Sequence, residues 1–282
     1  MTAPVPLPLI DNLIRRSLAE DLGDSGDITS AAIVAEEAQA SAMISARAAG
    51  VLAGVYVASR VFNLVDKTLR VTHRAIDGAS VEPGDVVLEV SGPARAILAS
   101  ERVALNFLGH LSGIATATAE IATVVKGTKA KVCCTRKTTP GLRVLEKYAV
   151  RCGGGVNHRF GLYDAILIKD NHIAISGGVS EAVRAAKTKA GHMINIEVEV
   201  DTLDQLDEAL SAGAQIVLLD NMTPEQLKEA VARTDGRALT EASGSITTNV
   251  ARAIAESGVD LISVGWITHS APCLDLGLDF TV

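Results

Sequence analysis

From residue 130 onward, short apolar runs alternate with longer amphipathic ones. The apolar runs have the length of buried β-strands, and the amphipathic runs repeat their apolar residues at the spacing of a helix. Alternation of this kind is typical of parallel strands joined by helical crossovers. We predict strands at 131–135, 164–168, 194–200, 215–220, 238–241 and 260–264, and helices at 180–190, 203–212, 224–233 and 249–256.

The ends of these helices carry recognisable signals. Thr202 with Gln205, and Thr223 with Gln226, match the capping-box spacing, and Pro224 suits the first position of a helix. Glycine ends a helix well because it adopts the left-handed conformation without strain. Each of the four helices is followed by one: Gly191, Gly213, Gly236 and Gly258.

Two architectures fit alternating strands and helices: a closed barrel and an open, doubly wound sheet. No Gly-x-Gly-x-x-Gly motif follows an early strand, which weakens the dinucleotide-binding version of the open sheet. Each predicted strand also delivers a polar residue or a glycine at its carboxyl end, as expected where catalytic groups gather at a barrel mouth. These residues are Arg136, Lys137, Lys169, Asp170, Glu199, Asp220, Asn221, Glu241, Ser243, Gly244 and Gly265.

Residues 1–105 show a different, mixed pattern. We expect antiparallel strands at 40–46 and 69–74, separated by turns rich in Gly and Pro, and a helix at 48–65. A long helical pattern at 102–125 leads out of this region, and the run 274–282 could return to pair with its sheet. The predicted fold is therefore α/β, with an N-terminal α+β sandwich domain (1–105, joined by 267–282) and a C-terminal (β/α) barrel-like domain (106–266).

Composition excludes several classes of protein. Aromatic residues make up only 3% of the chain, too few for a platform that stacks single-stranded nucleic acid, and the net charge of -7 argues against general attraction to nucleic acid. No apolar run has the length of a membrane span, and the first ten residues lack the basic start of a secretory signal. The four cysteines show no Cys-x-x-Cys spacing. We therefore expect a cytoplasmic protein with reduced thiols and no membrane or nucleic-acid partner.

Positive charge is concentrated in one segment of this acidic chain. Between Lys126 and Arg159 there are nine Lys or Arg residues and a single acid, Glu146. The segment is typical of a binding site for a small, highly charged anion. For four of these residues a solvated helix face is the favoured alternative: Lys126, Lys129, Arg143 and Lys147.

Three segments are specific enough to indicate a family. They read CTRKTTPGL (134–142), GGGVNHRFGLYD (153–164) and LIKDNH (167–172). With the stretches EDLGDSGDIT at Glu20 and ERVALNFLGHLSG at Glu101, they closely resemble the quinolinate phosphoribosyltransferases, and the resemblance runs along the whole chain. It implies transfer of phosphoribose from phosphoribosyl pyrophosphate to quinolinate with decarboxylation. The products would be nicotinate mononucleotide, pyrophosphate and CO2, in NAD biosynthesis.

Arginine suits a planar dicarboxylate because its guanidinium forks around a carboxylate and stays charged. By resemblance, the quinolinate carboxylates are held by Arg102, Arg136, His158, Arg159 and Lys169, and Thr135 is a further substrate-binding residue. The resemblance also implies that Arg102 enters from a neighbouring subunit, which makes the protein a homodimer with a shared active site. A surface ion pair near Glu101 is the alternative for Arg102.

The second substrate carries phosphate at both ends of a ribose. Glu199 and Asp220 supply carboxylates of the kind that bind Mg²⁺ together with substrate oxygens, and carboxylates also stabilise positive charge on the sugar. By resemblance, Lys137 faces the phosphates and Lys169 assists decarboxylation. The ribose-phosphate site maps to Ser243, Gly244, Ser245, Val264 and Gly265, with His269 as a further candidate.

Two competing functions stay open at this point. One is a related phosphoribosyltransferase that acts on nicotinate or another monocarboxylate, although one carboxylate needs fewer cations than this chain offers. The other is a non-catalytic barrel that binds an anion, although Glu199 and Asp220 would repel the ligand unless a metal intervened. Glu241 resembles a barrel-mouth carboxylate without an assignable role. The Gly153–Gly155 triplet fits a loop that shapes Arg159 better than a phosphate cradle.

Overall fold

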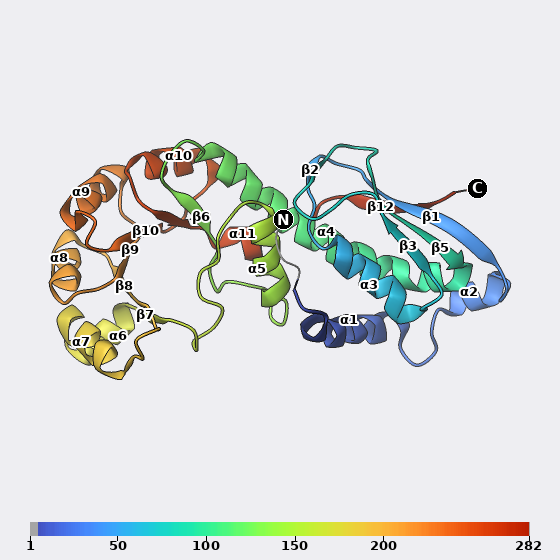
Figure 1. Ribbon diagram of the computed structural model, residues 1–282, viewed down its shortest axis with the longest axis horizontal. Helices are drawn as coiled ribbons and strands as arrows, with labels where there is room; N and C mark the ends of the chain where they lie inside the picture. Colours follow the sequence, from blue (N-terminus) through green and yellow to red (C-terminus); the bar gives the residue numbers. More distant parts are fainter. Residues whose placement is uncertain (1–4, 282) are drawn as a thin grey trace. The chain divides into compact units, whose positions relative to one another are not determined.

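The computed structural model describes residues 5–281, which form two compact units (Figure 1). One unit takes the chain up to Ala119, together with Thr139–Gly154 and the chain from Ser270 onward, and the other takes Glu120–Thr138 and Gly155–His269. Helix α4 (Ala94–Val124) begins in the first unit and ends in the second. The domain boundaries expected from the sequence stay a prediction.

The first unit is built on an antiparallel sheet with strand order β12-β1-β5-β3. On β1 the side chains of Ala42 and Ile44 are buried, whereas the intervening Met43 is half-buried, so one face of the sheet packs inward. β12 pairs with β1 in a register that places Leu278 opposite Ile44. The elements of this unit besides α4 are α1 (Leu7–Leu22), α2 (Ile28–Ile33), β1 (Gln39–Ala46), β2 (Gly50–Val51), α3 (Val55–Val65), β3 (Arg70–His73), β4 (Ser80–Val81), β5 (Val86–Pro93), α5 (Arg143–Cys152) and β12 (Leu276–Phe280).

Two predicted helices differ from the structure at their starts. The helix expected at 48–65 begins only at Val55, because Gly50–Val51 pairs with β4 and Gly54 takes a left-handed φ of 94° that no helix continues through. The helix expected at 102–125 begins eight residues earlier, at Ala94, since no glycine or proline interrupts the chain between Pro93 and Arg102.

Helix α5 overturns the expectation that Lys147 belongs to a solvated basic face. Lys147 and the preceding Glu146 are both fully buried. Glu146 accepts the Thr139 backbone N–H at 3.1 Å and lies 2.8 Å from His110 Nε2. At the end of the helix, a Cβ on Gly153 would lie 2.2 Å from the carbonyl oxygen of Ala115, so close packing against α4 requires this glycine.

The second unit is a parallel sheet of six strands in the order β6-β11-β10-β9-β8-β7. Helices α7, α8, α9 and α10 lie on the outer side of the curved sheet, as Figure 1 shows, so the predicted (β/α) barrel-like fold is confirmed. Val156 adds a parallel bridge beside Cys133 of β6. The elements are β6 (Lys131–Cys133), β7 (Ile166–Ile168), α6 (Asp170–Ser176), α7 (Val179–Lys189), β8 (Ile196–Val200), α8 (Leu203–Ser211), β9 (Ile216–Asp220), α9 (Pro224–Thr234), β10 (Leu239–Ser243), α10 (Thr248–Glu256), β11 (Leu261–Ser263) and α11 (Trp266–His269).

Both capping boxes predicted from the sequence are present. The Thr202 hydroxyl accepts the Gln205 N–H at 3.2 Å, and the Thr223 hydroxyl accepts the Gln226 N–H at 3.3 Å. Each box satisfies amide groups that the first turn of a helix leaves without a partner, and so fixes where α8 and α9 begin. These starts hold the strand–helix loops at the carboxyl edge of the sheet.

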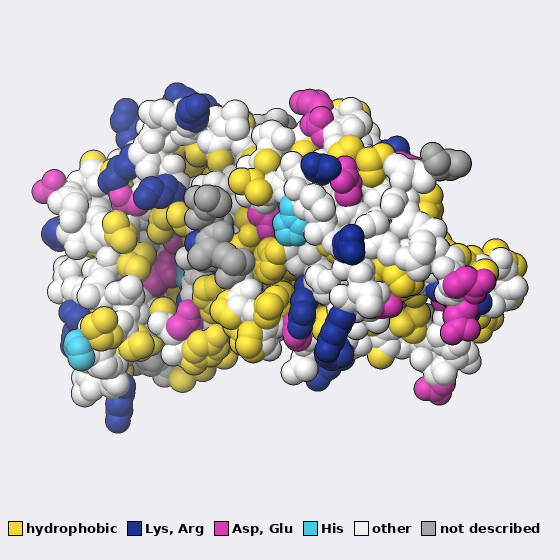
Figure 2. All heavy atoms as spheres, turned by 45° about the vertical axis from the view of Figure 1, so that its right-hand side comes forward, with side chains coloured by type: hydrophobic (Ala, Val, Ile, Leu, Met, Phe, Trp, Pro, Cys, Tyr) yellow, Lys and Arg dark blue, Asp and Glu magenta, His cyan; other side chains and the backbone are white. Residues whose placement is uncertain are grey.

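The surface carries no extended field of one charge on the face shown in Figure 2. Basic, acidic and apolar side chains are intermixed there. Within residues 5–281, no helix is both long enough and apolar enough to cross a lipid bilayer.

Candidate active site

A cavity of about 380 Å³ opens at the carboxyl ends of the strands in the second unit. Among its lining residues, only Leu167, Leu218 and Ser263 were not predicted as site residues from the sequence. The others are Thr135, Arg136, Lys137, His158, Arg159, Lys169, Glu199, Asp220 and Ser243. One rim therefore gathers guanidinium, ammonium and carboxylate groups from segments up to 84 residues apart in the sequence, from Arg136 to Asp220.

Parallel strand order explains why these side chains meet. β9 lies between β8 and β10, and Ser243 at the end of β10 stands opposite Asp220 at the end of β9. Glu199 lies one residue before the end of β8, and Lys169 directly follows β7. Because the strands run in one direction, their ends share one edge of the sheet.

Arg159 is held by the loop that precedes β7. Its Nη1 donates to the Ala165 carbonyl at 3.0 Å, and the Asp164 carboxylate ties the loop by accepting the N–H groups of Phe160 at 2.7 Å and Gly161 at 2.9 Å. Burial lowers the pKa of the Arg159 guanidinium, and the charge of Arg136 lowers it further. Because the two guanidiniums repel each other, an anion bound between them would be stabilised by both positive charges.

Both carboxylates that line the cavity accept a hydrogen bond from a neighbouring side chain. Lys169 Nζ donates to Glu199 Oε2 at 2.5 Å, and the Asn221 amide donates to Asp220 Oδ2 at 2.6 Å. The Lys169 side chain is 45% exposed, so its ammonium group is accessible to a ligand in the cavity. Neither carboxylate is sealed from the cavity, and both contribute to its lining.

The carboxylates of Glu199 and Asp220 fit a magnesium ion in their chemistry. Mg²⁺ prefers oxygen ligands and is commonly bound through one or two carboxylates plus substrate phosphates. These two residues come from neighbouring strands and line the same cavity. Bound there, the ion would neutralise developing charge on phosphate oxygens.

The loop after β10 has an unusual backbone. Gly244 has a φ of 108° and Ser245 a φ of 45°. A Cβ on Gly244 would lie 2.2 Å from the Asn221 side-chain oxygen, so this glycine permits close approach. Left-handed backbone at a non-glycine residue such as Ser245 is uncommon outside functional loops and special turns.

Gly265 brings the other predicted phosphate-site residues together. The position of a Cβ on Gly265 lies 3.1 Å from Lys137 Cδ, 3.6 Å from His269 Nε2 and 3.6 Å from Thr135 Oγ1. Val264 is buried, and its N–H already donates to the Cys133 carbonyl at 2.9 Å. Lys137 and His269 therefore both lie close to Gly265.

Arg102 is a predicted quinolinate-binding residue that does not line the cavity. It lies on the part of α4 that belongs to the first unit, and its side chain is exposed. Within residues 5–281 it forms no ion pair, so the alternative of a surface pair near Glu101 has no support.

Sequence reasoning missed one buried acid, Glu197. It lies two residues before Glu199 on β8, on the same side of the strand, and is only 5% exposed. Its carboxylate lies 2.8 Å from His158 Nε2. The alternation of acidic and apolar residues in IEVEV (196–200) was the signal that pointed to an inward-facing pair.

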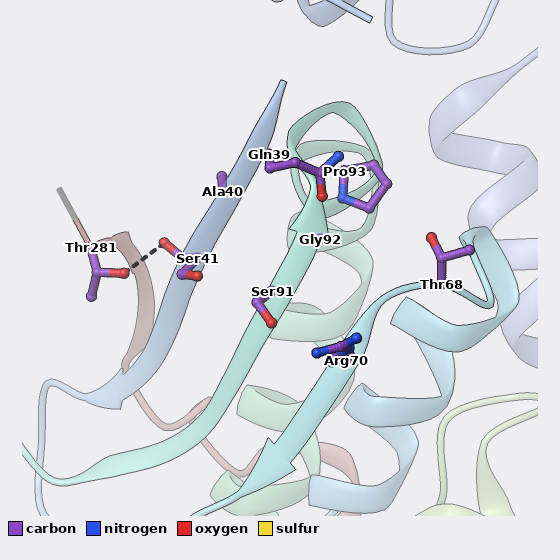
Figure 3. A pocket seen from close by; sticks show the side chains of 9 residues that line it. All are labelled: Gln39, Ala40, Ser41, Thr68, Arg70, Ser91, Gly92, Pro93 and Thr281. Carbon is purple, nitrogen blue, oxygen red and sulfur yellow. Dashed lines mark hydrogen bonds between the residues drawn. The ribbon is translucent and has the colours of Figure 1, made fainter. Parts of the chain in front are cut away.

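A larger hollow lies on the first unit, over the open face of its antiparallel sheet (Figure 3). Figure 3 shows mostly small and hydroxyl side chains around it, including Ser41, Ser91 and Thr281, with Arg70 as the one cation among the residues drawn. Thr281 donates to the Ser41 carbonyl at 3.0 Å. A single cation and no carboxylate offer no catalytic set, so the barrel cavity is the candidate active site.

Comparisons with known proteins cover both units of the chain. Residues 27–112 match the model for the quinolinate phosphoribosyl transferase N-terminal domain, and residues 114–279 match that for its C-terminal domain. The chain is 45% identical over 273 residues to a probable nicotinate-nucleotide pyrophosphorylase [carboxylating] of Bacillus subtilis (strain 168), covering 97% of this chain and 94% of that one. It is 47% identical over 271 residues to the nicotinate-nucleotide pyrophosphorylase [carboxylating] of Mycobacterium leprae (strain TN), covering 94% and 95%.

The solved structure of the nicotinate-nucleotide pyrophosphorylase from Francisella tularensis superposes on the chain with a TM-score of 0.92 at 41% identity, covering 100% of this chain and 99% of that one. The two domain models and relatives above 40% identity therefore match nearly the whole chain. The chain belongs to the quinolinate phosphoribosyltransferase family.

Proposed function

We propose that this chain transfers the phosphoribosyl group of phosphoribosyl pyrophosphate to quinolinate with loss of CO2, giving nicotinate mononucleotide for NAD biosynthesis. The single observation that carries the proposal is the composition of the barrel cavity. Two guanidiniums and one ammonium suit the two carboxylates of quinolinate, and two carboxylates on the same rim suit the electrophilic sugar.

Arg136, Arg159 and Lys169 bind and orient the pyridine dicarboxylate. Each guanidinium presents parallel N–H donors that match a carboxylate, and Lys169 adds a point charge beside them. Holding the ring nitrogen toward the anomeric carbon converts a bimolecular encounter into a step within one complex. His158 lines the same cavity and borders the ring.

The ring nitrogen then attacks the anomeric carbon as its bond to pyrophosphate breaks. Positive charge grows on the sugar, where the carboxylates of Glu199 and Asp220 stabilise it, and negative charge grows on the leaving oxygen, where Lys137 is the assigned cation. Mg²⁺, held by Glu199 and Asp220, is the proposed cofactor and would supply further charge neutralisation for the phosphates.

Decarboxylation follows once the pyridine nitrogen carries positive charge. The bond between C2 and its carboxylate breaks and CO2 leaves. The electron pair of that bond stays on C2, which then takes up a proton. Lys169 is the proposed assisting residue, because its ammonium group is accessible in the cavity. The ribose phosphate is assigned to the loops at Ser243–Ser245 and Val264–Gly265, together with His269.

A phosphoribosyltransferase for nicotinate is the competing activity, and substrate choice tests between them. With phosphoribosyl pyrophosphate and Mg²⁺, we expect nicotinate mononucleotide to form from quinolinate at least about 10²-fold faster than from nicotinate, because the missing carboxylate leaves a cation of the cavity unpaired. Chromatography of the product measures both rates. Faster use of nicotinate would overturn the proposal, and binding of quinolinate without any product would favour a non-catalytic barrel.

We also propose a homodimer in which Arg102 completes the site of the partner subunit. Arg102 is exposed and forms no ion pair within residues 5–281, as expected of a side chain that serves another chain. A cytoplasmic location is part of the same proposal, since Cys133, Cys134 and Cys152 are buried and none of them forms a disulfide within residues 5–281.

Mixing two inactive variants tests the shared site. Subunits with Arg102→Ala keep Arg136, and subunits with Arg136→Ala keep Arg102, so a mixed dimer contains one intact site. Random exchange after mild denaturation should restore about a quarter of the wild-type sites. The measurement is product formation before and after exchange. Each variant re-treated alone is the control, and no recovery in verified mixed dimers would contradict a cross-subunit role for Arg102.

A further inference from the structure

Below the barrel mouth lies a buried cluster formed by His158, Glu197 and Glu241. The Nε2 atom of His158 lies 2.8 Å from Glu197 Oε2 and 3.7 Å from Glu241 Oε1. The three side chains are 12%, 6% and 2% exposed, in that order. The Ser263 hydroxyl donates to Glu241, which fixes the third member from β11. Two carboxylates so deep in a core need specific partners.

Hydrogen bonds fix which nitrogen of His158 carries the proton. The backbone N–H of Arg159 donates to His158 Nδ1 at 2.8 Å, so Nδ1 uses its lone pair as an acceptor. The proton of a neutral imidazole must then be on Nε2, where it is donated to Glu197. The Arg159 N–H and the Glu197 carboxylate therefore favour the same tautomer, and Glu197 orients the ring at Nε2.

This hydrogen bonding also decides against reading the cluster as a metal site. The three residues place ligand atoms within 4.8 Å of one another, close enough to surround an ion. A metal at Nε2 would have to displace the proton donated to Glu197, and a metal-bound histidine normally donates from its other nitrogen. Here that nitrogen, Nδ1, is an acceptor.

The cluster lies under the substrate site rather than in it. His158 and Arg159 line the mouth cavity and also a second cavity of about 510 Å³, whereas Glu197 and Glu241 line only the second. Lys131 and Leu261, which begin their strands, also line that second cavity. Glu197 can therefore affect the mouth cavity only through His158 and Arg159, which line both cavities.

The negative charge of Glu197 also acts on the Arg159 guanidinium. The positive charges of Arg136 and Arg159 oppose each other, and the Glu197 carboxylate offsets this by favouring the charged form of Arg159. Glu197 Oε1 and Arg159 Nε are both buried and have no hydrogen-bond partner among the described residues. A fixed negative charge near Arg159 favours its charged form before an anion arrives, although Arg136 opposes it.

We propose that Glu197 is a positioning residue for the dicarboxylate site, acting through the orientation of His158 and the charge of Arg159. The proposal rests on the proposed function in one respect, namely that quinolinate is the anion bound above. Glu241 and Ser263 support this arrangement. The Ser263 hydroxyl donates to the Glu241 carboxylate, which lies 3.7 Å from the same imidazole nitrogen.

Nitrogen-15 NMR of the histidine ring tests the first half of the proposal without any substrate. In the free protein, His158 should show a protonated Nε2 and an unprotonated Nδ1, with its signals identified by their loss in His158→Gln. A protonated Nδ1 would overturn the proposal. This result is independent of catalysis, so it separates a failure of this inference from a failure of the proposed function.

Glu197→Gln tests the second half, because the amide oxygen can still accept the Nε2 proton while the charge is lost. We expect the Kd for quinolinate to rise about 10–100-fold, the range seen when partners behind a binding group are removed, with the Kd for phosphoribosyl pyrophosphate changed less than about twofold. Calorimetry measures both, and exposed Glu225→Gln on the same unit is the control. Unchanged affinity for quinolinate, or an equal loss for both substrates, would overturn the assignment. Should this variant not fold, Glu197→Asp, which retains the charge, replaces it and should bind quinolinate more tightly than Glu197→Ala does.

Discussion

Replacing Arg159 by Ala lowers kcat/KM for quinolinate by about 10²–10⁴-fold in our account and leaves the affinity for phosphoribosyl pyrophosphate nearly unchanged. Two charge-assisted hydrogen bonds to one carboxylate contribute about 1.5–3 kcal/mol each, and each 1.4 kcal/mol is a factor of ten. The Arg159 fork is oriented by its bond to Ala165 and lines the cavity. Initial rates with each substrate varied in turn give both constants.

Two further variants make this result specific. Arg159→Lys keeps the charge and loses the fork, so it should recover part of the loss only. Arg184→Ala removes an exposed arginine on α7 that pairs with Glu181, and should leave both constants unchanged. An equal loss of affinity for both substrates in Arg159→Ala would contradict the assignment of this residue to the dicarboxylate.

Replacing Asp220 by Asn lowers kcat by about 10²–10³-fold and raises the concentration of Mg²⁺ needed for half-maximal rate. Removal of one preorganised group that stabilises transition-state charge typically has an effect of this size. Asp220 is partly exposed and accepts one hydrogen bond, from Asn221, so its loss should leave the fold intact. Rates over a magnesium titration measure both effects.

The matched control for Asp220 is Asp204→Asn, which changes an exposed acid at the start of α8 in the same unit. It should retain wild-type kcat and magnesium dependence. Thermal unfolding of both variants checks that the fold is retained. If Asp220→Asn lost activity while its magnesium dependence stayed unchanged, Asp220 would act on the sugar alone and not on the metal.

The barrel was predictable because its signals are local and repeated. Capping boxes at Thr202 and Thr223 and strand-end polar residues each depend on a few neighbouring positions, and they recur along the chain. Parallel topology then places all carboxyl ends at one edge, so local signals were enough to assemble Arg136, Lys169 and Asp220 on one rim.

What the sequence did not predict depends on tertiary contacts. Lys147 belongs to a basic segment, but helix packing buries it completely, and charge patterning carries no information about such burial. The start of α3 depends on the left-handed backbone at Gly54, and this glycine could equally have been a tolerated helix residue. Glu197 was overlooked beside Glu199, although strand alternation turns both to the same side.

The most direct test of the central claim measures the release of CO2 from quinolinate rather than the binding of substrates. Quinolinate labelled in its 2-carboxylate is incubated with the protein, and labelled CO2 is collected together with pyrophosphate. If one barrel rim binds both substrates, CO2 and pyrophosphate should be released in equal amounts. Neither product should form when phosphoribosyl pyrophosphate or magnesium is left out. Release of CO2 without phosphoribosyl pyrophosphate, or of pyrophosphate without CO2, would contradict the account.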